Sequence, residues 1–139
     1  MARAPRNAAC PCGGRPAGTP YAGCCAHYID AFSDAPAPDA EALMRSRYTA
    51  FAHGNAAYLQ ASWHASTRPP SLVLEPDVQW LGLQVRAHRV LDDTHAEVEF
   101  IARSRAGGGP AQRLHERSRF VREQGDGAWR WFYVDGTLF

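Results

Sequence analysis

The chain has 139 residues, of which 45% are hydrophobic, and its formal net charge is +1 at neutral pH. This length suits one domain with a small appendage, and the hydrophobic fraction is too high for a disordered chain. The small net charge argues against a nucleic-acid-binding protein that relies on bulk electrostatics. No apolar stretch approaches about 18 residues, so the sequence predicts no membrane span.

The four cysteines lie in one short stretch near the start of the chain: Cys10, Cys12, Cys24 and Cys25. Tetrahedral zinc with Zn–S bonds of about 2.3 Å needs neighbouring sulfurs roughly 3.8 Å apart, and a Cys-x-Cys pair reaches this distance when the chain turns sharply. Gly13 and Gly14 supply the backbone freedom for such a turn. The cluster therefore predicts a zinc module.

Two disulfides, or thiols without a role, are the alternatives for this cluster. A disulfide framework requires a secreted context, and residues 1–9 contain no apolar run of the kind that a secretory signal needs. We therefore expect a cytoplasmic location. In that reducing compartment, clustered cysteines are more often metal ligands.

The cysteines, together with Tyr21 shortly before the second pair, resemble the SEC-C motif. This motif is the zinc module at the C-terminus of the preprotein translocase ATPase SecA. The resemblance implies that all four cysteines bind Zn²⁺, although Gly14 stands where Ser is usual and the loop between the cysteine pairs is longer. Four thiolates leave no open position for chemistry, so we expect a structural site that presents a small surface to a protein partner.

Residues 26–32 read as a short helix, and the alternating Pro and Ala in residues 33–38 indicate a stiff linker. We therefore expect a zinc module over residues 1–32 and a main domain over residues 39–139. In the main domain, Asp39 is a good N-cap for a helix that ends near His53, with Gly54 after it. A second helix is expected to start at Asn55 and to direct three side chains toward the core: Tyr58, Leu59 and Trp63.

After Pro76 the hydrophobic period changes to two, which predicts a meander of four antiparallel strands. Helices followed by such a meander predict an α+β fold, with the helices packed on one sheet face. The residues expected to face inward are Leu81, Leu83, Val85 and Ala87 in the first strand, Val98, Phe100 and Ala102 in the second, and Leu114, Glu116, Ser118 and Phe120 in the third.

Two charged residues fall on apolar faces: Arg47 in the first helix and Glu116 in the third strand. A buried charge is costly unless it is paired, so the simplest expectation is a structural ion pair between them. A ligand-binding or catalytic pair is the alternative. Asp135, near the end of the last strand, is either a turn former or a pocket acid.

Tyr48, Trp63 and His64 complete the candidate pocket residues. His64 lies beside Ser66 and Thr67, where the imidazole either favours the negative helix end or takes part in acid–base chemistry. Most of the tryptophans are expected in the core, although a curved sheet lined with aromatic side chains can also leave a ligand cavity.

Several segments of the main domain resemble the bacterial YchJ family: residues 43–51, 58–59, 63–69, 80–83, 115–120 and 129–136. With the cysteine motif, the resemblance covers nearly the whole chain. It implies a nuclear transport factor two-like (NTF2-like) fold, in which a curved antiparallel sheet and helices form a cone. The fold alone does not decide the function, because it hosts both enzymes and binding domains.

The sequence thus predicts a zinc-binding protein whose cone either binds a small molecule or serves as a dimerisation scaffold, with a homodimer as one expected state. The alternative is an isomerase-like or dehydratase-like enzyme. In that enzyme, Glu116 or Asp135 would be the general base, and Arg47, Tyr48 or His64 would polarise the substrate.

Overall fold

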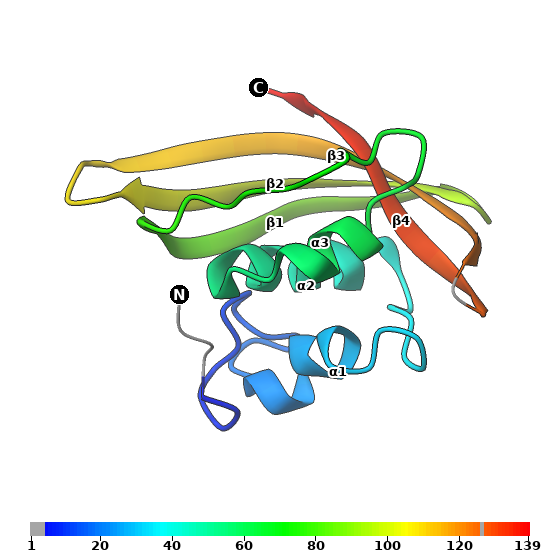
Figure 1. Ribbon diagram of the computed structural model, residues 1–139, viewed down its shortest axis with the longest axis horizontal. Helices are drawn as coiled ribbons and strands as arrows, with labels where there is room; N and C mark the ends of the chain where they lie inside the picture. The colour runs from blue at the N-terminus through cyan, green and yellow to red at the C-terminus, as the bar shows by residue number, and fades with distance from the viewer. Residues whose placement is uncertain (1–4, 126) are drawn as a thin grey trace.

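The computed structural model describes residues 5–125 and 127–139, which are arranged in layers (Figure 1). A four-stranded antiparallel sheet lies on one side, helix α2 lies against it with α3 beside α2, and the cysteine-containing segment with α1 lies beyond α2. Among the described residues, no helix is long and apolar enough to cross a membrane. The elements are η1 Tyr21–Gly23, α1 Cys25–Ile29, α2 Ala40–His53, α3 Ala56–Ala61, β1 Val78–Asp92, β2 His95–Ala106, β3 Ala111–Gly125 and β4 Ala128–Leu138.

Capping residues set both ends of α2 and the start of α3. Asp39 accepts a hydrogen bond from the Ala42 backbone N–H at 2.8 Å, and Asn55 accepts one from the Tyr58 N–H at 3.0 Å. Gly54 ends α2 in the left-handed region, with a φ of 70°. The predicted start and end of α2 and the predicted start of α3 are therefore confirmed.

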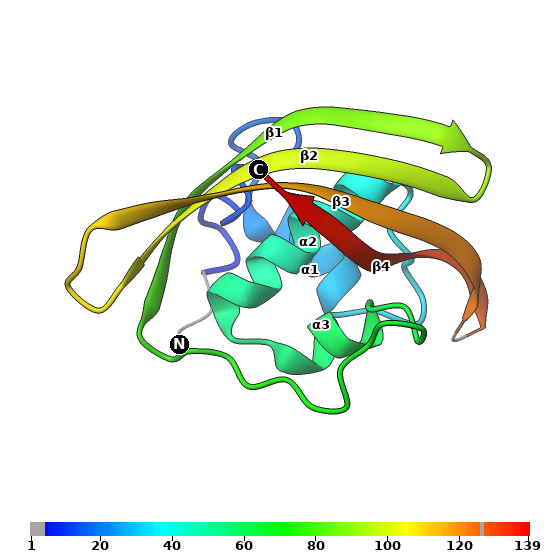
Figure 2. The ribbon, with the colours of Figure 1, turned by 90° about the horizontal axis from the view of Figure 1, so that it is seen from above.

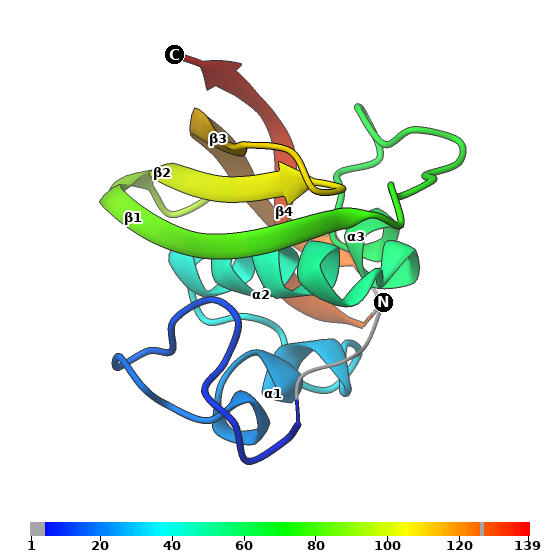
Figure 3. The ribbon, with the colours of Figure 1, turned by 90° about the vertical axis from the view of Figure 1, so that its left-hand side faces the viewer.

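The strands pair in the order β1-β2-β3-β4, and the sheet curves over α2 (Figures 2 and 3). The period-two pattern correctly predicted the inner face of the two central strands, because Val98, Phe100, Ala102, Ser118 and Phe120 are all buried. The fold is the expected α+β arrangement. Its concave face is closed by α2, which gives the cone an interior.

A bulge in β1 changes which of its residues face the helices. The strand register shifts between Trp80 and Gly82, so Leu81 lies within the bulge and remains 36% exposed. Trp80 packs against the Tyr48 ring instead, at a centroid distance of 5.6 Å. The prediction that Leu81 faces inward is therefore wrong, because the extra residue of a bulge interrupts the alternation of side chains.

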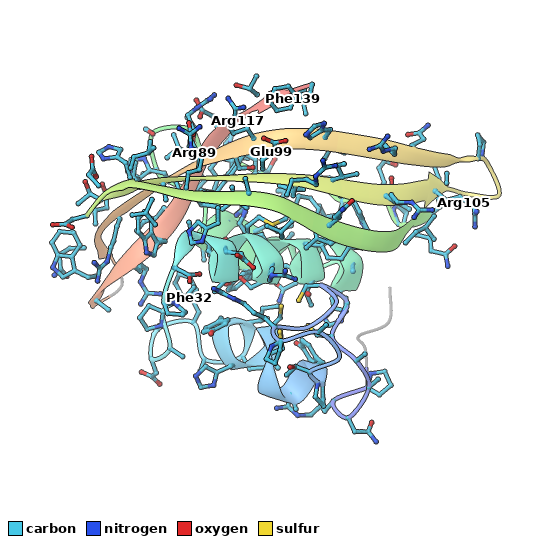
Figure 4. All side chains as sticks on the ribbon, turned by 180° about the vertical axis from the view of Figure 1, so that it is seen from behind. Phe32, Arg89, Glu99, Arg105, Arg117 and Phe139 are labelled. Carbon is cyan, nitrogen blue, oxygen red and sulfur yellow. The ribbon has the colours of Figure 1, made fainter. Side chains whose placement is uncertain are left out.

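The outer face of the sheet carries a row of alternating charges that crosses all four strands. Arg89 Nη1 lies 3.7 Å from Glu97 Oε1, Glu97 pairs in register with Arg119, and Arg119 Nε donates to Asp135 Oδ1 at 2.5 Å. Figure 4 shows Arg89 and Arg117 on the side of the sheet away from the helices. Asp135 therefore belongs to the outer face.

Arg130 on β4 ties the segment between α1 and α2 to the sheet. Its guanidinium donates to the backbone oxygens of Gly125 and Phe32, both at 2.7 Å, and of Ser33 at 3.2 Å. The guanidinium carbon also lies 4.4 Å from the centre of the Phe32 ring. The start of the predicted linker is thus fixed against the main domain, while the proposed boundary between two folding units stays a prediction.

Replacing Arg130 with Met should lower the free energy of unfolding by about 2–4 kcal/mol, because partly buried backbone carbonyls lose their donor. Arg113→Met, at an exposed position on the outer strand surface, should cost less than about 0.5 kcal/mol. Urea denaturation followed by tryptophan fluorescence measures both values. Equal losses in the two variants would contradict the role given to Arg130.

Candidate metal centre and sheet pocket

The four cysteines converge in the structure as the sequence predicts. Their sulfur atoms all lie within 4.8 Å of one another, and every one of the four side chains is buried. The Cys12 and Cys24 sulfurs are 3.7 Å apart, close to the roughly 3.8 Å that a tetrahedral thiolate site requires. All four are free thiols, so the geometry suits a metal ion better than a pair of disulfides.

A tight backbone loop brings the two cysteine pairs together. The Cys10 N–H donates to the Thr19 oxygen at 3.1 Å, and the Gly14 N–H points at the Cys12 sulfur at 3.4 Å. Gly14 has a φ of 85°, and a Cβ there would overlap the Thr19 backbone. Glycine at this position is therefore required for the loop to close.

The electrostatics of the cluster favour thiolate formation at Cys10 and Cys24, whereas hydrogen bonds with Cys10 raise the pKa of Cys12 and of Cys25. Hydrogen bonds from the Cys12 and Cys25 thiols lower the pKa of Cys10 well below its usual range, although burial opposes this change. Thiolates are the form that binds soft metal ions. Four sulfur donors around one centre fit a closed tetrahedral ion, which would stabilise the fold but leave no site for a substrate.

The cysteine segment packs directly on α2. Arg45 Nη1 donates to the Cys12 backbone oxygen at 3.0 Å, and the Cys10 sulfur lies 3.7 Å from Thr49 Oγ1. Arg15 makes two hydrogen bonds with the Asp39 carboxylate, at 2.9 and 3.0 Å. The buried cysteines consequently belong to the same hydrophobic core as the apolar residues of α2.

On another face, α2 meets the sheet around a cavity of about 260 Å³. We call this cavity the sheet pocket. Three of the predicted pocket residues line it: Arg47, Tyr48 and Glu116. Most of its remaining surface is apolar. The other lining residues are Met44, Phe51, Trp80, Phe100, Ala102, Leu114, Ser118, Phe120 and Tyr133.

Arg47 is a nearly buried cation, with 6% of its surface exposed. Its Nη1 donates to the Leu59 backbone oxygen at 2.8 Å and to Ser62 Oγ at 2.7 Å. Its guanidinium carbon lies 4.5 Å from the Tyr133 ring centre and 5.1 Å from that of Trp63. Burial lowers the pKa of Arg47 to about 10, so the group still carries its charge near neutral pH.

Glu116 is held by its own strand and by β4 rather than by Arg47. Ser118 Oγ donates to Glu116 Oε2 at 2.5 Å, and a side chain at Gly136 would overlap the same carboxylate. Within the described residues, no ion pair joins Arg47 to a carboxylate. The predicted Arg47–Glu116 ion pair is therefore wrong. Burial and the neighbouring Glu116 charge raise the pKa of Tyr133 to about 12.

The structure places the other three predicted pocket residues outside the sheet pocket. The Trp63 ring contacts the Arg47 guanidinium and packs against Tyr133, with the centroids of the two rings 5.1 Å apart. Asp135 lies on the outer face with Arg119, because β4 is bulged at this point, so its assignment as a pocket acid is wrong.

His64 forms a separate surface cluster. Its Nδ1 lies 2.6 Å from Ser66 Oγ, and its Nε2 lies 2.9 Å from Glu123 Oε1. Sequence reasoning missed Glu123 because 59 positions separate it from the histidine. It also missed Ser62, whose role as an acceptor for Arg47 depends on how α3 packs.

Comparison with known proteins supports this fold and its cysteine segment. Residues 39–136 match the family described as YchJ, middle NTF2-like domain. A UPF0225 protein from Polaromonas sp. is 60% identical over 94% of this chain and 93% of its own length. Another from Methylibium petroleiphilum is 54% identical over 93% of this chain and 88% of its own length.

A solved structure shares both parts of the architecture. It is the solution structure of a SEC-C motif containing protein from Rhodopseudomonas palustris, with 32% sequence identity and a TM-score of 0.79. The alignment covers 94% of this chain and 98% of that protein. Because the family match spans more than half of the chain and the relatives align over almost all of it, this chain belongs to the YchJ family.

Proposed function

We propose that the protein binds a small, largely apolar molecule in the sheet pocket, and that a zinc-loaded cysteine module supports α2 from its other side. The observation that carries this proposal is the pocket itself. About 260 Å³ of space lies among aromatic and aliphatic side chains, with one buried cation and one carboxylate at its wall. An apolar cavity with a few polar groups is the usual form of a small-molecule site.

Zinc is the metal that we propose for the cysteine cluster. Four soft thiolates select zinc over hard cations such as Mg²⁺ or Ca²⁺, which prefer oxygen ligands. The similar protein from Rhodopseudomonas palustris is described as containing a SEC-C motif, which supports the same assignment. A protein partner at the module and a homodimer remain predictions.

An enzyme that uses Glu116 as a general base is the second candidate. The observation in its favour is that the Glu116 carboxylate lines the same pocket as Arg47 and Tyr48. In such a reaction, Glu116 would take a proton from a bound substrate, and Arg47 would stabilise the negative charge that develops. Asp135 and His64 lie outside this pocket and have no part in this scheme.

Indole should bind the wild-type protein and shift amide resonances around the sheet pocket in nitrogen-15 NMR spectra. Ala102→Leu places a larger side chain inside the cavity and should weaken indole binding by about tenfold or more. Ala106→Leu, at the exposed end of β2, is the matched control and should bind indole normally. Equal indole binding by both variants would place the ligand elsewhere.

The protein purified without added metal should carry one zinc ion per chain in native mass spectra. Removing this ion with a strong chelator should lower the melting temperature by about 10 °C or more, since binding free energy contributes to folding. Restoring zinc should restore the melting temperature. A metal-free mass lower by four thiol hydrogens would instead indicate two disulfides and would contradict the zinc site.

Glu116→Gln should cost only about 1 kcal/mol of unfolding free energy, because Gln keeps an acceptor for Ser118 and only the charge is lost. A directly paired buried charge would cost about 3–5 kcal/mol when its partner is removed. Glu97→Gln on the outer face serves as the control in the same urea titration. A loss of unfolding free energy above about 3 kcal/mol for Glu116→Gln alone would indicate that Glu116 is directly paired with a buried cation, contrary to the structure.

A further inference from the structure

We propose that the ligand of the sheet pocket is a small monocarboxylate with a flat apolar body, and that Arg47 binds its carboxylate. This inference rests on the proposed function, because it names the class of molecule that the pocket takes. It requires three features of the structure: a buried cation with donors to spare, a limit on negative charge, and an apolar surface for the rest of the ligand.

Arg47 has unused hydrogen-bonding capacity. In the described part of the chain, both hydrogen bonds of its guanidinium are made by Nη1, to Leu59 and Ser62. Nε and Nη2 have no protein acceptor among these residues, and together they form the fork that binds a carboxylate through two parallel hydrogen bonds. A nearly buried guanidinium that lines a cavity without a directly paired carboxylate, and that interacts with Glu116 only at longer range, is a recognition group for an anion.

Aromatic rings hold Arg47 in place. The Tyr133 and Trp63 rings lie 4.5 and 5.1 Å from its guanidinium carbon. Their electron-rich faces attract the cation without supplying a hydrogen-bond acceptor. The guanidinium is thus fixed in orientation before any ligand binds, and a planar oxyanion can be bound with little loss of side-chain entropy.

Glu116 sets the limit on the charge of the ligand. Its carboxylate lines the same cavity, where Ser118 holds it too far from Arg47 for an ion pair. A dianion such as a phosphate ester would be repelled by this carboxylate in a largely apolar space. A single carboxylate at Arg47 adds the least negative charge that still uses the free fork.

The remaining surface suits a flat apolar group. Phe100, Phe120 and Trp80 come from the sheet, and Met44 and Phe51 come from α2. The cavity volume of about 260 Å³ lies just below the range of about 300–1,000 Å³ that is common for small-molecule sites. A molecule with one ring, about the size of benzoate, fits this description.

The test compares benzoate, benzamide and toluene as probes of the same size in NMR titrations. Wild-type protein should bind benzoate about tenfold more tightly than benzamide, because only benzoate offers a charged acceptor to the Arg47 fork. Benzoate should also shift the side-chain Nε–H resonance of Arg47. That second measurement needs no variant, so it tests the proposal even where a substitution fails to fold.

Arg47→Lys keeps the positive charge but removes the fork, and it should weaken benzoate binding by about tenfold while leaving toluene binding unchanged. Arg103→Lys on the outer face is the matched control and should behave like the wild type. Their nitrogen-15 spectra and melting temperatures establish that both variants are folded.

The other possible binding results distinguish failure of the carboxylate inference from failure of the proposed function. If toluene and benzamide bind in the sheet pocket as tightly as benzoate, the carboxylate inference is overturned and the proposed small-molecule function stands. The carboxylate inference is likewise overturned if Arg47→Lys keeps the full preference for benzoate. If none of the three probes and no indole enters the pocket, both proposals are overturned.

Discussion

Helix α2 is buried on two faces, and the rest of the structure depends on this double packing. One face carries Arg45 and Thr49 to the cysteine segment, and the other carries Arg47 and Tyr48 to the sheet pocket. Side chains three and four positions apart share a helix face, so a single helix can present two such sets at once. The cysteine cluster and the sheet pocket are therefore two sides of one packing arrangement.

The second constraint is the cost of burying Arg47. A charge removed from water is stable only when other groups replace its hydration. Here a backbone carbonyl, a hydroxyl and two aromatic rings replace it, and no carboxylate among the described residues completes a direct pair. This arrangement retains the charge and leaves part of the guanidinium available. A structural ion pair would have used the same donors and closed the site.

Local signals in the sequence predicted much of the fold. The capping residues Asp39, Gly54 and Asn55 act within a few positions of themselves, so they could be recognised without knowledge of the tertiary structure. The cysteine cluster was predictable for the same reason, since the spacing within each pair restricts its sulfurs to one small volume. Inward-facing residues of the central strands followed from simple alternation.

The errors arose where tertiary geometry changes a local pattern. Strand bulges moved Leu81 out of the inner face and placed Asp135 on the outer one, and a bulge leaves no clear mark in an alternating sequence. Arg47 and Glu116 line one cavity, but the sequence could not show that Ser118 holds the carboxylate away from the cation. The separation of these two charges depends on where the two side chains are anchored.

Helix α2 also links the cysteine segment to the sheet pocket, because it contacts both. Four thiolates around a bound metal would fix the Cys12 backbone, whose oxygen accepts a hydrogen bond from Arg45. Arg45 and Arg47 are two positions apart on a helix whose backbone is rigid over that distance, so a shift of α2 at one face must move the other. We therefore expect the metal centre to act on the pocket through the position of α2. A structural ion with no open coordination position can influence ligand binding in this way without contacting the ligand.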